Sequence, residues 1–151
     1  TWFQWVFDLR PMWYYVGTVG DVFHTISCFS NPLLTWAGVP AILFTTYRAL
    51  FKKDTVAWYI VVGYFSGLLP WIIYVHRIVF AYHFYPTSLF TIIAIVYCIY
   101  HLKQRKYQFV VPVYLALYLG LFILFLPITT GFGTTIQFAK FLAWLPGWYF
   151  G

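Results

Sequence analysis

The sequence predicts an all-α integral membrane protein: a bundle of four transmembrane helices with interfacial aromatic segments at both ends. Hydrophobic residues make up 63% of the 151 residues and charged residues only 8%, a balance that soluble domains do not show. Four apolar runs are long enough for a hydrocarbon core of ~30 Å, which takes about 20 helical residues. Because backbone groups in lipid pair within their own segment, and these runs do not alternate in polarity, we expect helices and not barrel strands.

The expected spans are residues 32–51, 56–75, 84–102 and 110–132 of a single transmembrane domain, 1–151. The first begins at Asn31-Pro32, where asparagine suits the cap and proline suits the first helical turn. The second contains Gly63 and Gly67, a spacing of small residues that lets two membrane helices approach closely. These two glycines are therefore the expected helix-packing residues.

The two ends of the chain are expected to lie at the membrane surface as interfacial segments, residues 1–30 and 133–151. Both are rich in tryptophan and tyrosine, whose amphipathic rings favour the headgroup level. An aromatic belt is the simplest interpretation of most of these side chains.

The orientation of the chain across the membrane can be predicted from the basic residues near the spans. Six of the nine lysines and arginines lie in or beside loops 51–55 and 103–109. The excess of basic residues in cytoplasmic loops predicts that both of these loops are cytoplasmic. Both termini and the 76–83 loop are then expected on the non-cytoplasmic face.

A cationic and aromatic cluster between the second and third spans is the candidate lipid-phosphate site. Arginine grips phosphate with a forked set of donors, and histidine and tyrosine add single hydrogen bonds. The candidate residues are Arg77, His83, Tyr82, His76, Tyr85 and, from the N-terminal segment, Arg10. A simpler alternative stays open: Arg77 extends to ordinary headgroups, the tyrosines belong to the aromatic belt, and Arg10 pairs with Asp8.

The sequence gives little support for catalysis, metal binding or nucleic-acid binding. The three acidic residues, Asp8, Asp21 and Asp54, form no recognisable pair for acid–base work, so no catalytic residue is assigned. The histidines lack the spacing of metal ligands, and no cofactor is expected. Nucleic acid is excluded as a partner because the net charge of +6 is divided among loops. Membrane lipids are the expected partners.

Several short motifs occur in the order seen in the C-terminal four-helix region of protein O-mannosyltransferases. They are LRPMWYY at 9–15, NPLL at 31–34 with Trp36, LPW at 69–71, Arg77 with Phe80, YHFYP at 82–86 and FLP at 125–127. The chain resembles that region from end to end. Each motif alone is weak, because tryptophan and proline are common near the ends of membrane helices, whereas the ordered set is much more specific.

The resemblance implies a polytopic membrane glycosyltransferase that moves mannose from a polyprenyl-phosphate carrier to protein hydroxyls on the outer face. This region would help position the polyprenyl-phosphate-linked sugar. It would not be catalytic by itself, because the family's acidic catalytic residues lie in the N-terminal half. The alternative is a non-catalytic structural or accessory subunit of a larger membrane complex, with other membrane protein chains as partners.

Overall fold

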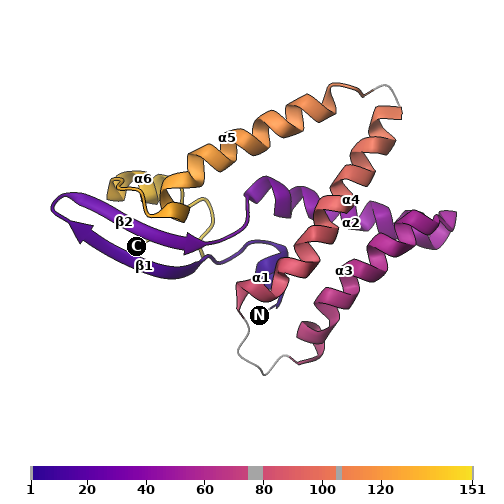
Figure 1. The fold of residues 1–151 in the computed structure, drawn as a ribbon, viewed down its shortest axis with the longest axis horizontal. Helices are drawn as coiled ribbons and strands as arrows, with labels where there is room; N and C mark the ends of the chain where they lie inside the picture. Colours follow the sequence, from indigo (N-terminus) through magenta and orange to yellow (C-terminus); the bar gives the residue numbers. More distant parts are fainter. Residues whose placement is uncertain (1, 75–79, 105–106, 151) are drawn as a thin grey trace.

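A computed structural model of the chain describes residues 2–74, 80–104 and 107–150 (Figure 1). The fold is mostly helical, and one antiparallel hairpin lies near its N-terminus. In chain order the elements are α1 (Trp2–Val6), β1 (Met12–Val19), β2 (Val22–Cys28), α2 (Pro32–Lys52), α3 (Thr55–Ile73), η1 (Ala81–Phe84), α4 (Tyr85–Gln104), α5 (Val110–Thr130) and α6 (Ile136–Phe141).

Three stretches of the described chain are helical, long and apolar enough to cross a membrane: Thr55–Ile73, Tyr82–Lys103 and Val110–Thr130. They correspond to α3, α4 with the end of η1, and α5. The first expected span forms α2, a helix of 21 residues that begins as predicted, with Asn31 accepting a hydrogen bond from Leu33 and proline in the first turn. Because α2 carries threonines and basic residues, its membrane crossing stays a prediction.

Helix α4 is the centre of the bundle and packs against both α2 and α3. On α3, a Cβ at Gly63 would overlap the ring of Phe90, and one at Gly67 would lie 2.6 Å from the hydroxyl oxygen of Thr87. Helices α3 and α4 therefore approach so closely that these two positions have room only for glycine.

Residues 12–28 form a β-hairpin, so the expectation of an all-helical fold is too narrow. The register runs from Met12 opposite Cys28 to Val19 opposite Val22. Both strands are rich in aromatic and β-branched residues, which favour strands, and Gly20 takes the turn with a φ of 63°. Alternate residues of β2 are buried, as expected for a strand with one covered face.

The hairpin and the C-terminal segment pack together on one end of α5. Phe23 and Thr134 exchange backbone hydrogen bonds of 2.9 and 2.8 Å, and the Trp13 indole donates to the carbonyl of Tyr149. In Figure 1 this group of elements lies beside the start of α2 and the start of α4. The two ends of the chain thus build one surface around the N-terminal ends of these helices.

A polar cluster fixes the turn between α2 and α3 at the other end of the bundle. Arg48 Nη2 lies 2.9 Å from Asp54 Oδ2, and the Tyr97 hydroxyl of α4 donates to the same oxygen at 2.6 Å. The other oxygen of Asp54 caps α3 by accepting from the backbone of Val56. These hydrogen bonds hold the pKa of Asp54 at about 2, below its ordinary value. Arg48, which the sequence indicates as a topology determinant, also joins three helices.

Candidate functional site

A polar cavity of about 320 Å³ lies where α1, the end of β2, the start of α2 and the start of α4 meet. The surrounding helices offer mostly apolar surface, so this concentration of polar groups marks the cavity as the candidate site. Its polar wall consists of Gln4, Asp8, Arg10, Cys28, Ser30, Tyr85, Ser88 and Tyr118.

Asp8 is the most unusual side chain in this wall. Only 5% of the residue is exposed, and its Oδ2 atom has no hydrogen-bond partner among the described residues. Burial raises the pKa of Asp8 to about 7, and a hydrogen bond from the backbone of Ser30 opposes that rise in part. Burial, followed by the Asp8 charge, raises the pKa of the neighbouring Cys28 thiol. The cavity therefore holds a carboxyl group that changes protonation near neutral pH.

Arg10 and Tyr85, two of the predicted phosphate-binding residues, line the same cavity. Both side chains are exposed, which places their donors where a ligand can reach them. Asp8 and Arg10, both in the described part of the chain, form no ion pair with each other, so the local pairing considered from sequence does not occur.

Tyr82 and His83 lie next to the cavity in an aromatic cluster and are not part of its wall. The ring centroid of His83 is 4.1 Å from that of Trp71 and 4.2 Å from that of Tyr82, and the His83 ring stacks on Trp5. Nδ1 of His83 lies 3.1 Å from the backbone nitrogen of Phe80. The predicted residues His76 and Arg77 lie outside the described residues.

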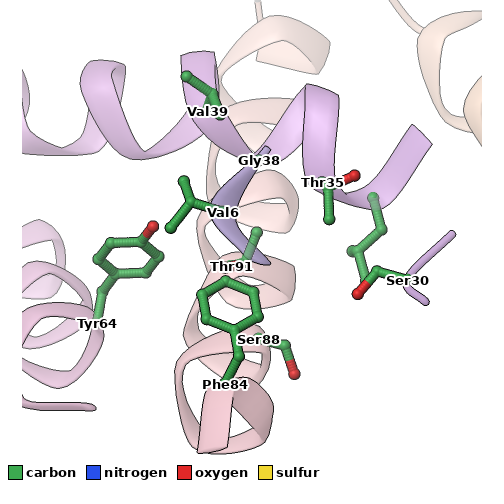
Figure 2. A pocket seen from close by; sticks show the side chains of 10 residues that line it. Val6, Ser30, Thr35, Gly38, Val39, Tyr64, Phe84, Ser88 and Thr91 are labelled. Atoms are coloured by element: carbon green, nitrogen blue, oxygen red, sulfur yellow. The ribbon is translucent and has the colours of Figure 1, made fainter. Parts of the chain in front are cut away.

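A narrow pocket continues inward from the cavity between α2, α3 and α4 (Figure 2). Ser30, Leu34, Phe84 and Ser88 line both spaces. The inner pocket has a volume of about 10 Å³, which is enough for about one water molecule. It therefore extends the polar wall but has no room for a larger ligand.

An apolar groove of about 500 Å³ continues from the cavity in another direction, between α4 and α5. Leu34, Ile92 and Tyr118 line both the cavity and the groove. The side-chain amide of Asn31 donates to the carbonyl of Tyr118 at 3.1 Å, which ties α5 to the start of α2. The polar cavity and the apolar groove thus adjoin each other. This arrangement suits a ligand with a polar head and a long apolar tail.

Two bacterial relatives match most of the chain. A Corynebacterium glutamicum protein is 27% identical over 95% of the chain, and a Mycobacterium tuberculosis protein is 26% identical over 78% of it. Both are named polyprenol-phosphate-mannose–protein mannosyltransferase. The chain is similar to these mannosyltransferases. The resemblance inferred from the ordered motifs is thereby confirmed.

The chain spans only 31% of the length of the Corynebacterium mannosyltransferase and 24% of that from Mycobacterium. No protein-family model matches the chain, and no solved structure matches it. The similarity to the mannosyltransferases therefore concerns a part of those proteins.

Sequence reasoning missed Asp8, Ser30 and Ser88 as residues of the site. Asp8 lies directly before the LRPMWYY motif at 9–15, but its burial depends on distant parts of the chain, among them the C-terminal segment with Trp148. Ser88 lies one turn into α4 from Tyr85, and that helical spacing was the available signal.

Proposed function

We propose that this chain binds a polyprenyl-phosphate-linked mannose at the non-cytoplasmic surface, as the carrier-binding part of a mannosyltransferase-like enzyme. The observation that carries the proposal is the continuity between the polar cavity and the apolar groove, which share Leu34, Ile92 and Tyr118. The named activity of the bacterial relatives agrees with such a ligand.

The phosphate would lie at the mouth of the cavity, between Arg10 and Tyr85. A guanidinium offers paired N–H donors that match phosphate oxygens, and a phenol adds one further hydrogen bond. Both side chains are exposed, so neither needs to break a buried contact to reach the phosphate.

The prenyl chain would follow the groove between α4 and α5. The groove is lined mainly by aliphatic and aromatic side chains, with Ile95, Val96 and Leu115 along its length. Burying an isoprenoid chain there contributes about 25 cal/mol for each Å² of apolar surface removed from water. The groove would thereby hold the carrier while its head stays at the cavity.

We assign the acid–base groups for transfer itself to another part of such an enzyme, because the chain spans only 31% of the length of the Corynebacterium relative. We place the cavity on the non-cytoplasmic face because the basic residues beside loops 51–55 and 103–109 favour the cytoplasm. In the fold the end of α2 and the end of α4, which precede these loops, lie away from the hairpin (Figure 1). The proposed role is to position the carrier.

One observation favours the alternative of an accessory subunit that packs against other membrane proteins. Strand β1 exposes four consecutive large side chains, Trp13, Tyr14, Tyr15 and Val16. An exposed apolar patch of this kind marks surfaces that contact lipid or protein.

Carrier binding can be tested with the chain in lipid nanodiscs, by measuring the affinity for polyprenyl phosphate. Replacing Arg10→Gln should weaken binding about 10-fold or more, because a charge-assisted hydrogen bond of roughly 1.5–3 kcal/mol is lost. Lys140→Gln is the matched control, since it removes an exposed charge of α6 outside the cavity. If the two substitutions weaken binding equally, the binding reflects general attraction between basic residues and lipid, and the proposed phosphate site is wrong.

A further inference from the structure

Asp8 Oδ2 is a buried hydrogen-bond acceptor that the folded chain leaves without a described partner. Asp8 is 95% buried, and it forms part of the wall of the 320 Å³ cavity. An unsatisfied polar atom in such a place costs roughly 1–3 kcal/mol, and more if it carries charge. Since Asp8 lines the cavity, a ligand donor that reached this shielded atom would lower that cost.

The groups around Asp8 indicate which kind of donor fits. Arg10 lines the cavity but forms no ion pair with Asp8, and the other polar side chains there include Gln4, Cys28, Tyr85 and Tyr118. A phosphate next to a carboxylate is repelled, so Asp8 does not suit the anionic part of a carrier. A hydroxyl group, which can donate a hydrogen bond and carries no charge, suits it well.

We infer that Asp8 accepts a hydrogen bond from a hydroxyl of the sugar on a polyprenyl-phosphate carrier, and so distinguishes the glycosylated carrier from the bare one. This inference rests on the proposed function, because it assigns the inner wall of the same cavity. Arg10 and Tyr85 bind the phosphate, and Asp8 accepts a hydrogen bond from the sugar beyond it. A glycerol headgroup offers similar hydroxyls, and the test separates it from a sugar.

Backbone contacts that do not involve the carboxyl group help to hold Asp8 in place. Residue 8 has a φ of 51°, a left-handed conformation that asparagine and aspartate tolerate better than most residues. The Trp148 indole donates to the backbone carbonyl of Asp8 at 2.6 Å. Asp8→Asn therefore keeps the backbone contacts and the shape, and changes only the charge and the donor pattern.

Protonation of Asp8 should tune this selectivity. Burial raises the pKa of Asp8 to about 7, so the carboxyl is mostly ionised at pH 8 and mostly protonated at pH 6. The ionised form is the stronger acceptor, because hydrogen bonds to a charged group are about twice as strong as neutral ones. The preference for the glycosylated carrier should increase from pH 6 to pH 8 in the native chain.

The test compares three lipids on the full chain in nanodiscs: polyprenyl-phosphate mannose, polyprenyl phosphate and phosphatidylglycerol. Asp8→Asn should weaken binding of the mannosylated carrier at pH 8 by about fivefold or more. It should leave the other two lipids within about twofold and should remove the pH dependence of the preference. Asp21→Asn, an exposed change in the hairpin turn, is the control.

Different failures have different meanings. If the native chain binds neither polyprenyl lipid, the proposed function and this inference both fail. If it binds both and Asp8→Asn changes neither affinity, the carrier site stands and the assignment of Asp8 is wrong. A loss confined to phosphatidylglycerol would also overturn it, since the hydroxyls recognised would then belong to glycerol.

Discussion

The indole N–H of Trp148 donates to the backbone carbonyl of Asp8 at 2.6 Å, joining residues that are 140 positions apart. Both partners are buried, and Trp148 also packs on Phe29, which lines the cavity. The C-terminal segment therefore helps to shape the cavity although it contributes no side chain to the polar wall described above.

Removing this bond should loosen the cavity. Trp148→Phe keeps an aromatic ring but loses the donor, so we expect a loss of about 1 kcal/mol in unfolding free energy and weaker binding of polyprenyl phosphate. Trp144→Phe is the control, because Trp144 stacks on Trp148 and is itself exposed. Thermal unfolding and lipid affinity in the same nanodiscs measure both effects. If the two substitutions behave alike, the hydrogen bond has no special role.

The close packing of α3 on α4 leads to a second prediction, which concerns a glycine of α3. Gly63→Ala should destabilise the bundle by roughly 1–3 kcal/mol, because the new methyl group meets the ring of Phe90. Gly120→Ala in α5 should be neutral or stabilising, since nothing lies within 4 Å of its added Cβ and alanine favours helix. Unfolding in detergent with increasing denaturant compares the two. An equal loss in both variants would contradict the close approach.

The raised pKa of Asp8 predicts how stability depends on pH. Its pKa is 3.8 in the unfolded chain and about 7 in the fold, so the folded state binds the proton more tightly. Protonation of Asp8 therefore adds to the free energy of unfolding, and this stabilisation is fully present below pH 3.8. It amounts to at most on the order of 4 kcal/mol and is lost as pH rises to 7. Melting curves between pH 4 and pH 8 should show this decline in the native chain and a flatter profile in Asp8→Asn. Parallel profiles would mean that Asp8 is not buried.

The polar cluster at the opposite end should respond in the other direction. Tyr97→Phe removes a donor to Asp54, so we expect a loss of about 1 kcal/mol at pH 7. The pKa of Asp54 is lowered to about 2, so its contribution is present above pH 3.8 and is lost as pH falls towards 2. The difference between Tyr97→Phe and the native chain should therefore shrink in acid. Tyr100→Phe, an exposed change on the same helix, should have little effect at any pH.

Local signals in the sequence were enough to predict the long helices and some residues of the candidate site. Asn31-Pro32 and the apolar runs predict where helices begin and end, because capping and hydropathy act within a few residues. The hairpin had a local signal as well, since Gly20-Asp21 lies between strand-favouring runs, but an aromatic membrane segment is equally typical of an interfacial helix or loop.

The burial of Asp8 had no such local signal. It depends on Trp148 and on the start of α4, which are far from Asp8 in the sequence, so no pattern around residue 8 could reveal it. The same reason explains the difference between Tyr82, in η1, and Tyr85, the first residue of α4: they are three residues apart, but only Tyr85 lies in the cavity wall. Long-range packing decides which members of a predicted cluster form the site.

Photocrosslinking with a polyprenyl phosphate that carries a diazirine in its first prenyl units tests the carrier site most directly. Adducts should be found on the side chains that line the apolar groove, among them Ile92, Ile95, Val96 and Ile99 of α4 and Val111, Tyr114, Leu115 and Tyr118 of α5. They should decrease when unlabelled polyprenyl phosphate is added and in Arg10→Gln. Adducts spread evenly over exposed positions of α3, such as Tyr59 and Val62, and unaffected by competition would contradict the carrier site.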